Sequence, residues 1–198
     1  LVRETVNGDT RTIARASTRD STRTIGWVDP LAQTFLIDDV GGVFLTDMDL
    51  YFSTKDASVP ITVQIREVVN GYPGKTILPF SEKTLNPGSV SVSTDASVAT
   101  KFTFDSPVYI QENVEYCFVV LANSNNYNMY VGRLGEKVIG SDRTISQQPY
   151  TGVLFKSQNG STWVAEQNED AKFILNRAEF SQTTGTVSLS MQNYQLEH

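Results

Sequence analysis

The sequence of 198 residues holds one cysteine and one histidine, the two side chains most often used as nucleophile, base or zinc ligand. A single Cys117 excludes an intrachain disulfide and a cysteine-rich metal site. The only histidine, His198, ends the sequence within Leu196-Glu197-His198, which we interpret as a tag remnant (196–198). Ser-His-Asp and Cys-His nucleophilic systems and zinc sites are therefore not expected, and Cys117 is predicted to be a buried, unreactive thiol.

Several longer patterns are missing as well. The chain has no apolar run of the length that spans a bilayer and no basic-then-apolar leader, so we expect no membrane span. It has no Gly-x-Ser-x-Gly motif and no glycine-rich phosphate loop, and no segment shows helical periodicity. These absences predict a protein that is not an enzyme. The start at Leu1, together with the tag-like end, suggests a piece cut from a longer protein.

Charge is also scarce, at 19% of residues, and the net charge is −6. An acidic chain of this kind is not expected to bind nucleic acid. The first 25 residues differ, because they are rich in threonine and carry five arginines: Arg3, Arg11, Arg15, Arg19 and Arg23. We interpret residues 1–25 as a polar linker or a strand that pairs with a partner.

What the sequence does contain, from Trp27 onward, is a series of about ten short strands separated by turn signals. In residues 43–53, Met48, Leu50 and Phe52 share one face and Asp47 and Asp49 the other. Residues 61–69 alternate in the same way, with Ile61, Val63 and Ile65 inward and Thr62, Gln64 and Arg66 outward. Residues 115–122 are apolar on both faces, which predicts a central strand covered on both sides.

The pattern predicts an all-β fold, a two-sheet antiparallel β-sandwich that is jelly-roll-like, with an immunoglobulin-like sandwich as the alternative. The expected sandwich domain is 26–182, followed by a trailing strand or linker to a next domain at 183–195. Turns are expected at residues 70–74 and at Asp105-Ser106-Pro107, and residues 135–149 are expected to be irregular. Asn159-Gly160 predicts a hairpin between residues 151–156 and 161–165.

Several stretches resemble a module of large virion structural proteins in T4-like tailed phages, especially those of marine cyanobacteria. The likeness covers about residues 29–180 and is carried by Asp29-Pro30-Leu31-Ala32-Gln33-Thr34-Phe35, Asn70-Gly71-Tyr72-Pro73-Gly74, Phe102-Thr103-Phe104-Asp105-Ser106-Pro107, Glu115-Tyr116-Cys117-Phe118-Val119 and Gln148-Pro149-Tyr150-Thr151-Gly152. A shorter part is similar to jelly-roll modules of bacterial surface proteins. The resemblance implies a component of a tail, baseplate or fibre, located in the virion, whose partners are other virion proteins or neighbouring domains of the same chain.

Binding of a host-surface glycan is the alternative function, because sugar rings stack on aromatic side chains while amides bind their hydroxyls. The candidate platform residues are Tyr72, Tyr127, Tyr130, Trp163, Asn123 and Asn125. No cofactor is expected, and calcium has only weak candidate ligands in Asp38, Asp39, Glu169 and Asp170, with Glu166 nearby. A glycan hydrolase or lyase is a remote alternative, for which Asp47 and Asp49 would supply paired carboxylates.

Overall fold

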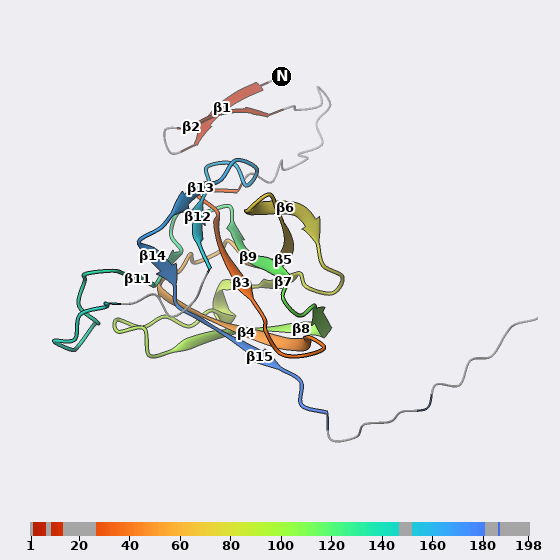
Figure 1. Ribbon diagram of the computed structural model, residues 1–198. Helices are drawn as coiled ribbons and strands as arrows, with labels where there is room; N and C mark the ends of the chain where they lie inside the picture. Colours follow the sequence, from red (N-terminus) through yellow and green to blue (C-terminus); the bar gives the residue numbers. More distant parts are fainter. Residues whose placement is uncertain (1, 7–8, 14–26, 147–151, 181–185, 187–198) are drawn as a thin grey trace, which may run out of the picture.

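The computed structural model describes residues 2–6, 9–13, 27–146, 152–180 and 186, and in this part of the chain it is built of strands with no α-helix (Figure 1). Accordingly, no described helix is long and apolar enough to cross a membrane. The strands are β1 (Val2–Val6), β2 (Asp9–Ile13), β3 (Leu31–Leu36), β4 (Val43–Thr54), β5 (Ile61–Val69), β6 (Tyr72–Ile77), β7 (Lys83–Leu85), β8 (Ala99–Ile110), β9 (Glu115–Ala122), β10 (Asn128–Met129), β11 (Val131–Arg133), β12 (Leu154–Lys156), β13 (Val164–Glu166), β14 (Glu169–Ala171) and β15 (Phe173–Arg177).

The larger sheet has the order β13-β12-β3-β9-β5, and β6 and β7 both pair with β5. All of its pairings are antiparallel. Strand β9 lies between β3 and β5, with Phe118 opposite Gln33 on one side and Ile65 on the other. The most apolar strand is therefore the central one, as the sequence predicts.

The smaller sheet is built around β4, which pairs with β8 along one side and with β15 along the other. Strand β10 continues the pairing at the C-terminal end of β4, where Met129 lies opposite Phe52. The two sheets pack face to face around one large core. The chain passes between them from β3 to β4, from β4 to β5, from β7 to β8 and from β8 to β9, which is a jelly-roll-like order. The predicted all-β, two-sheet antiparallel sandwich is confirmed.

The large core is made by the inward faces of both sheets. Met48, Leu50 and Phe52 of β4 meet Ile65 of β5 and Phe118 of β9, and all five are almost fully buried. Asp47 and Asp49 lie on the opposite face of β4, as expected from the alternation. Burial of these apolar side chains is the main stabilising contribution to a sandwich of this kind.

A second buried cluster covers the other face of the larger sheet. It contains Ala32, Cys117, Val119, Leu121, Phe155 and Trp163, with Trp27, Val68 and Val153 packed against it. The sheet curls enough to bring Tyr72 of β6, near one edge, within 5.7 Å of Phe155 of β12, near the other, measured between ring centroids. The predicted burial of β9 on both faces is thus confirmed.

The curl also overturns one expectation. Thr62, Gln64 and Arg66 do face away from the main core, but they are buried under the curled sheet instead of being exposed to solvent. Their polar groups bind one another and their neighbours. The Gln64 Oε1 atom accepts hydrogen bonds from Arg66 Nε and Nη2 at 2.9 and 2.6 Å, and Thr62 pairs with Thr84 at 2.8 Å. Buried polar groups need such partners.

Two predicted turns differ from expectation, since one is shorter and the other is an irregularity within a strand. The turn between β5 and β6 is the two-residue Asn70-Gly71, with φ of 54° and 79°, so Tyr72, Pro73 and Gly74 already belong to β6. Strand β8 continues through Asp105-Ser106-Pro107, but its pairing with β4 shifts there, from Val108 opposite Leu45 to Thr103 opposite Asp47. Proline can lie in this bulge because β8 pairs with no described strand other than β4, and an edge strand can do without one amide hydrogen.

The hairpin around Asn159-Gly160 is confirmed, since β12 and β13 pair antiparallel. Its connection is a longer loop in which Asn159 Oδ1 accepts hydrogen bonds from the amides of Ser161 and Thr162 at 2.9 and 2.8 Å. In the predicted linker, β1 and β2 pair only with each other among the described strands. The rest of residues 1–25 and most of the trailing segment 183–195 lie outside the described residues, as does the tag-like 196–198.

Candidate functional site

A hairpin-like strap covers β11 and β14 where the sequence predicts irregular structure. We call residues 134–146 the strap. Its two arms are joined by backbone hydrogen bonds, from Gly135 N to Ile145 O (2.9 Å), from Ile145 N to Glu136 O (2.9 Å) and from Val138 N to Arg143 O (2.8 Å). These bonds pair backbone N–H and C=O groups that an irregular loop would leave to hydrogen-bond with water, so the two arms of the strap are held together.

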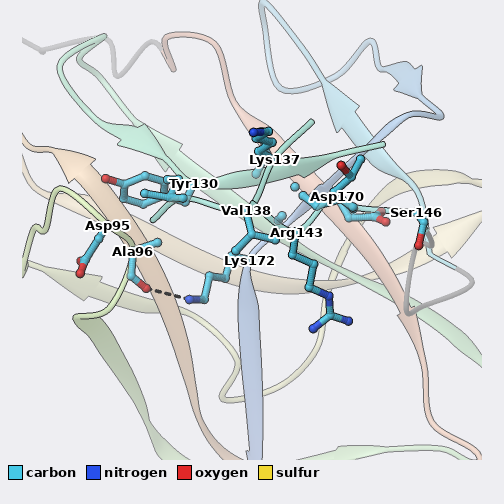
Figure 2. Close-up of a pocket in the computed structure, with 15 residues that line it drawn as sticks. Asp95, Ala96, Tyr130, Lys137, Val138, Arg143, Ser146, Asp170 and Lys172 are labelled. Carbon is cyan, nitrogen blue, oxygen red and sulfur yellow. Dashed lines mark hydrogen bonds between the residues drawn. The ribbon is translucent and has the colours of Figure 1, made fainter. Parts of the chain in front are cut away.

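Beneath the strap lies a pocket of about 490 Å³ (Figure 2), a volume typical of ligand-binding clefts. We call it the strap pocket. Most of its lining is apolar, from Ala96, Val131, Val138, Ile139, Ile145 and Ala171. Tyr130 and Asp95 lie at one side and Asp170 and Ser146 at the other.

Most of the charged groups around the strap pocket already have partners. Lys172 Nζ donates to Ala96 O at 2.7 Å and lies 4.3 Å from the centre of the Tyr51 ring. Lys137 forms an ion pair with Asp142 at 2.8 Å. Arg143 also lines the pocket, and its guanidinium makes no hydrogen bond or ion pair with any residue that the structure describes. Figure 2 shows it clear of the other labelled side chains.

Asp170 connects the strap pocket to the sandwich. Its Oδ1 accepts a hydrogen bond from Gln33 Nε2 at 3.1 Å, and Gln33 Oε1 accepts one from Ala171 N at 2.9 Å. Its Oδ2 is buried without a hydrogen-bond partner in the described part of the chain. Burial raises the pKa of the Asp170 carboxyl, because the charged form loses hydration that a single hydrogen bond only partly replaces.

The aromatic residues predicted to form a glycan platform do not gather in one place. Tyr130 lines the strap pocket, and its hydroxyl donates to Ser93 O at 2.7 Å. Tyr127 packs its ring on Phe52 and donates its hydroxyl to Val59 O at 2.5 Å. Both hydroxyls are thus used within the protein.

The other two aromatic candidates lie at the second cluster. Tyr72 is exposed and contacts Phe155, whereas Trp163 is only 8% exposed and packs in the cluster itself. A ring buried to this degree offers little surface on which a sugar could stack, which differs from the expected platform.

The polar residues that follow β9 mainly donate hydrogen bonds to the side chain of Asp56. Asp56 accepts hydrogen bonds from Ser124 Oγ (2.6 Å), Asn126 Nδ2 (2.8 Å) and the amides of Ser58 and Val59 (2.8 Å each). These bonds, led by that of Ser124, lower the pKa of Asp56 well below its ordinary value. The candidates Asn123 and Asn125 make no hydrogen bond with the described residues, and Asn125 is exposed.

The acidic candidates for calcium are also kept apart. Glu169 binds Lys156 at 2.7 Å and forms an ion pair with Arg133, which together lower the pKa of its carboxyl. Asp170, the next residue along β14, turns to Gln33, and Asp39 pairs with Arg177. No group of three metal-binding side chains lies together in the described ranges.

The paired carboxylates of β4 are held by neighbouring strands. Lys101 of β8 lies 2.6 Å from Asp47 and 3.3 Å from Asp49, and Asn176 of β15 donates to both. One Asp49 oxygen has no hydrogen-bond partner among the described residues, although it forms the ion pair with Lys101. These contacts support the interpretation of the pair as the polar outer side of a strand.

Two residues of the strap pocket were candidates from the sequence, Tyr130 for glycan binding and Asp170 for calcium binding. The other lining residues were not predicted. The usable signal was the pair Val138-Ile139, which stands between Lys137 and Gly140 in an otherwise polar stretch. Two β-branched apolar residues in such a stretch indicate a local contact surface.

Comparison of the chain with protein-family models, curated proteins and solved structures gives no match.

Proposed function

We propose that this chain is a non-catalytic structural module of a phage virion, in the tail, baseplate or fibre, and that it mediates protein–protein assembly. The observation that carries the proposal is a group of aromatic side chains on the outer face of the smaller sheet. We call Phe44 of β4, Tyr109 of β8 and Phe180, which follows β15, the aromatic patch.

The three rings of the aromatic patch pack on one another while remaining open to solvent. The ring centroids of Phe44 and Tyr109 are 5.1 Å apart, and those of Phe44 and Phe180 are 5.5 Å apart. Their exposed fractions are 40%, 47% and 66% for Phe44, Tyr109 and Phe180. Aromatic residues gathered on a surface are enriched in protein interfaces, where a partner removes them from water.

The chemistry of the patch favours a protein partner over a sugar. The Tyr109 hydroxyl donates to Gly41 O at 3.0 Å, so it is already used, and Phe44 and Phe180 have no polar side-chain group. The virion as the setting comes from the resemblance to phage structural modules.

The non-catalytic part of the proposal is supported by the state of the reactive groups. Burial raises the pKa of the Cys117 thiol to about 12, so its nucleophilic thiolate is scarce at neutral pH. Asp47 and Asp49 are both bound by Lys101. Glu169 is bound by two cations.

The test is a cryo-electron microscopy reconstruction of the virion that carries the parent protein. We expect Phe44, Tyr109 and Phe180 to be covered by a neighbouring subunit or domain. The Phe44→Ser/Phe180→Ser variant should fold, because both side chains are exposed, but should incorporate poorly into particles. A patch that faces solvent in the assembled virion would overturn the proposal.

Adsorption to a host glycan is the second candidate function. Fewer observations support it than support assembly, because the predicted aromatic platform is divided between separate regions. Tyr130, the exposed Tyr72 and the free amides of Asn123 and Asn125 are what remains for it. A glycan array on the purified chain tests this alternative, and signal that Tyr130→Ala abolishes would favour it over assembly alone.

A further inference from the structure

We infer that the strap pocket binds the carboxylate end of a protein chain whose last residues are aliphatic. This inference goes beyond the proposed function, because it concerns a different surface and does not require the aromatic patch.

The walls of the strap pocket match branched aliphatic side chains. Val131 comes from β11, Val138 and Ile139 from the outer arm of the strap, and Ile145 from its returning arm. Val131, Val138 and Ile139 remain exposed although they surround a concavity. A valine or leucine side chain placed between these walls would remove apolar surface of both partners from water.

The side-chain donors that the strap pocket leaves free belong to a cation, Arg143. The carboxylate of Asp95 is bound by Ser97 through Oγ at 2.6 Å and the amide at 3.0 Å, and that of Asp142 lies 2.8 Å from Lys137. Asp170 is bound to Gln33 and its second oxygen is buried. Arg143 alone among the charged lining residues has a side chain without a partner in the part of the chain that the structure describes.

A guanidinium with free donors pairs best with a carboxylate, which it can bind through two parallel hydrogen bonds. Arg143 lies at the exposed rim, five residues from Val138, so a ligand that places an apolar side chain inside would carry its carboxylate at the rim. A chain terminus has this arrangement, with a carboxylate one bond from the carbon that bears the last side chain.

A carboxylated sugar matches the strap pocket less well. Its ring hydroxyls need several donors and acceptors, whereas the Tyr130 hydroxyl, the Lys172 ammonium and the Asp95 carboxylate are already bonded. Tyr130 is the one aromatic residue of the lining, so a sugar finds only one ring on which to stack.

The experiment measures binding of a fluorescein-labelled peptide that ends in valine and leucine to the full chain, by fluorescence anisotropy. The matched probe is the same peptide with an amidated end, which lacks the negative charge. We expect the free acid to bind at least about tenfold more tightly than the amide. Arg143→Gln should weaken the free acid by about tenfold and leave the amide unchanged, because both changes remove the same ion pair.

Lys75→Gln is the matched control, since it removes one positive charge from an exposed residue of β6 that does not line the pocket. It should bind both probes as the unmodified chain does. Arg143 is exposed, so circular dichroism should show that its variant is folded. Phe44→Ser should also keep peptide binding, and this separates the inference from the assembly proposal.

Equal affinity for acid and amide would overturn the inference, and so would an absence of saturable binding of the free acid up to about 1 mM. Displacement of the peptide by glucuronate at lower concentration than by hexanoate would assign the site to acidic sugars instead.

Discussion

Glu169 is a buried carboxylate that lies between two cations. Its side chain is only 6% exposed and joins Arg133 of β11 to Lys156 of β12. We predict that Glu169→Gln lowers the free energy of unfolding by about 1–2 kcal/mol, less than for a fully buried pair because both cations can turn to solvent. Urea denaturation measures this. Glu166→Gln is the control, since Glu166 lies 3.7 Å from the same lysine but is far more exposed, and its effect should be near zero.

Asp56 sets a dependence of stability on pH. Its pKa is lowered in the folded chain, whereas in the unfolded chain it returns to the ordinary 3.8. Its hydrogen bonds therefore stabilise the fold fully above that value, and the contribution is lost as the pH falls toward the folded-state pKa. Between about pH 5 and pH 3, the urea midpoint of the unmodified chain should fall more steeply than that of Asp56→Asn. Parallel curves would contradict the role assigned to Asp56.

At the level of elements, the turn between β5 and β6 depends on its glycine. Gly71 has φ of 79°, where a side chain is strained. We predict that Gly71→Ala costs about 1 kcal/mol of stability. Gly88→Ala is the control, because Gly88 has neither positive φ nor a heavy atom near the added methyl group, and a comparable loss there would show that the effect is not conformational.

The thiol of Cys117, on strand β9, should be unreactive in the folded chain. Cys117 is buried in the second cluster and its pKa is raised to about 12. The folded chain should react with a thiol reagent at pH 8 only at the rate at which it opens, and the chain in denaturing urea should react at once. Rapid modification under native conditions would mean that the outer face of the larger sheet is accessible.

Local sequence predicted those elements whose burial follows a simple period. β4 and β9 are examples, since the alternation of Met48, Leu50 and Phe52 and the continuous apolar run around Cys117 directly reflect how many faces are covered. β6 and β8 were misjudged at Pro73 and Pro107, because proline signals a turn unless its strand leaves that amide unpaired. The local sequence does not show which amide positions of a strand will be paired with a neighbouring strand.

For the whole molecule, the main difference between expectation and structure is the second cluster. Trp163 was expected at the surface, yet it packs with Phe155 because the larger sheet curls over its own outer face. We predict that Trp163→Ala lowers the free energy of unfolding by about 3 kcal/mol or more. Tyr72→Ala, at the exposed edge of the same region, should cost clearly less, and both are measured by urea denaturation.

The strap pocket could not have been assembled from the sequence for the same reason. Asp95, Tyr130, Arg143 and Asp170 come from four separate segments, and only the folded sandwich brings them together. The sequence could show that Val138 and Ile139 are apolar, but not what lies opposite them.

The alternation of the chain between its two sheets also has a consequence for how fast the molecule forms. β3 must find β9, β4 must find β8 and β15, and β12 must find β3, while few of the pairings join neighbours in sequence. The chain between these partners is many tens of residues long, and closing it costs entropy before the contacts lower the free energy. Folding should therefore take milliseconds to seconds. During that time β9 is an exposed apolar strand, and a newly made chain is then most prone to aggregate.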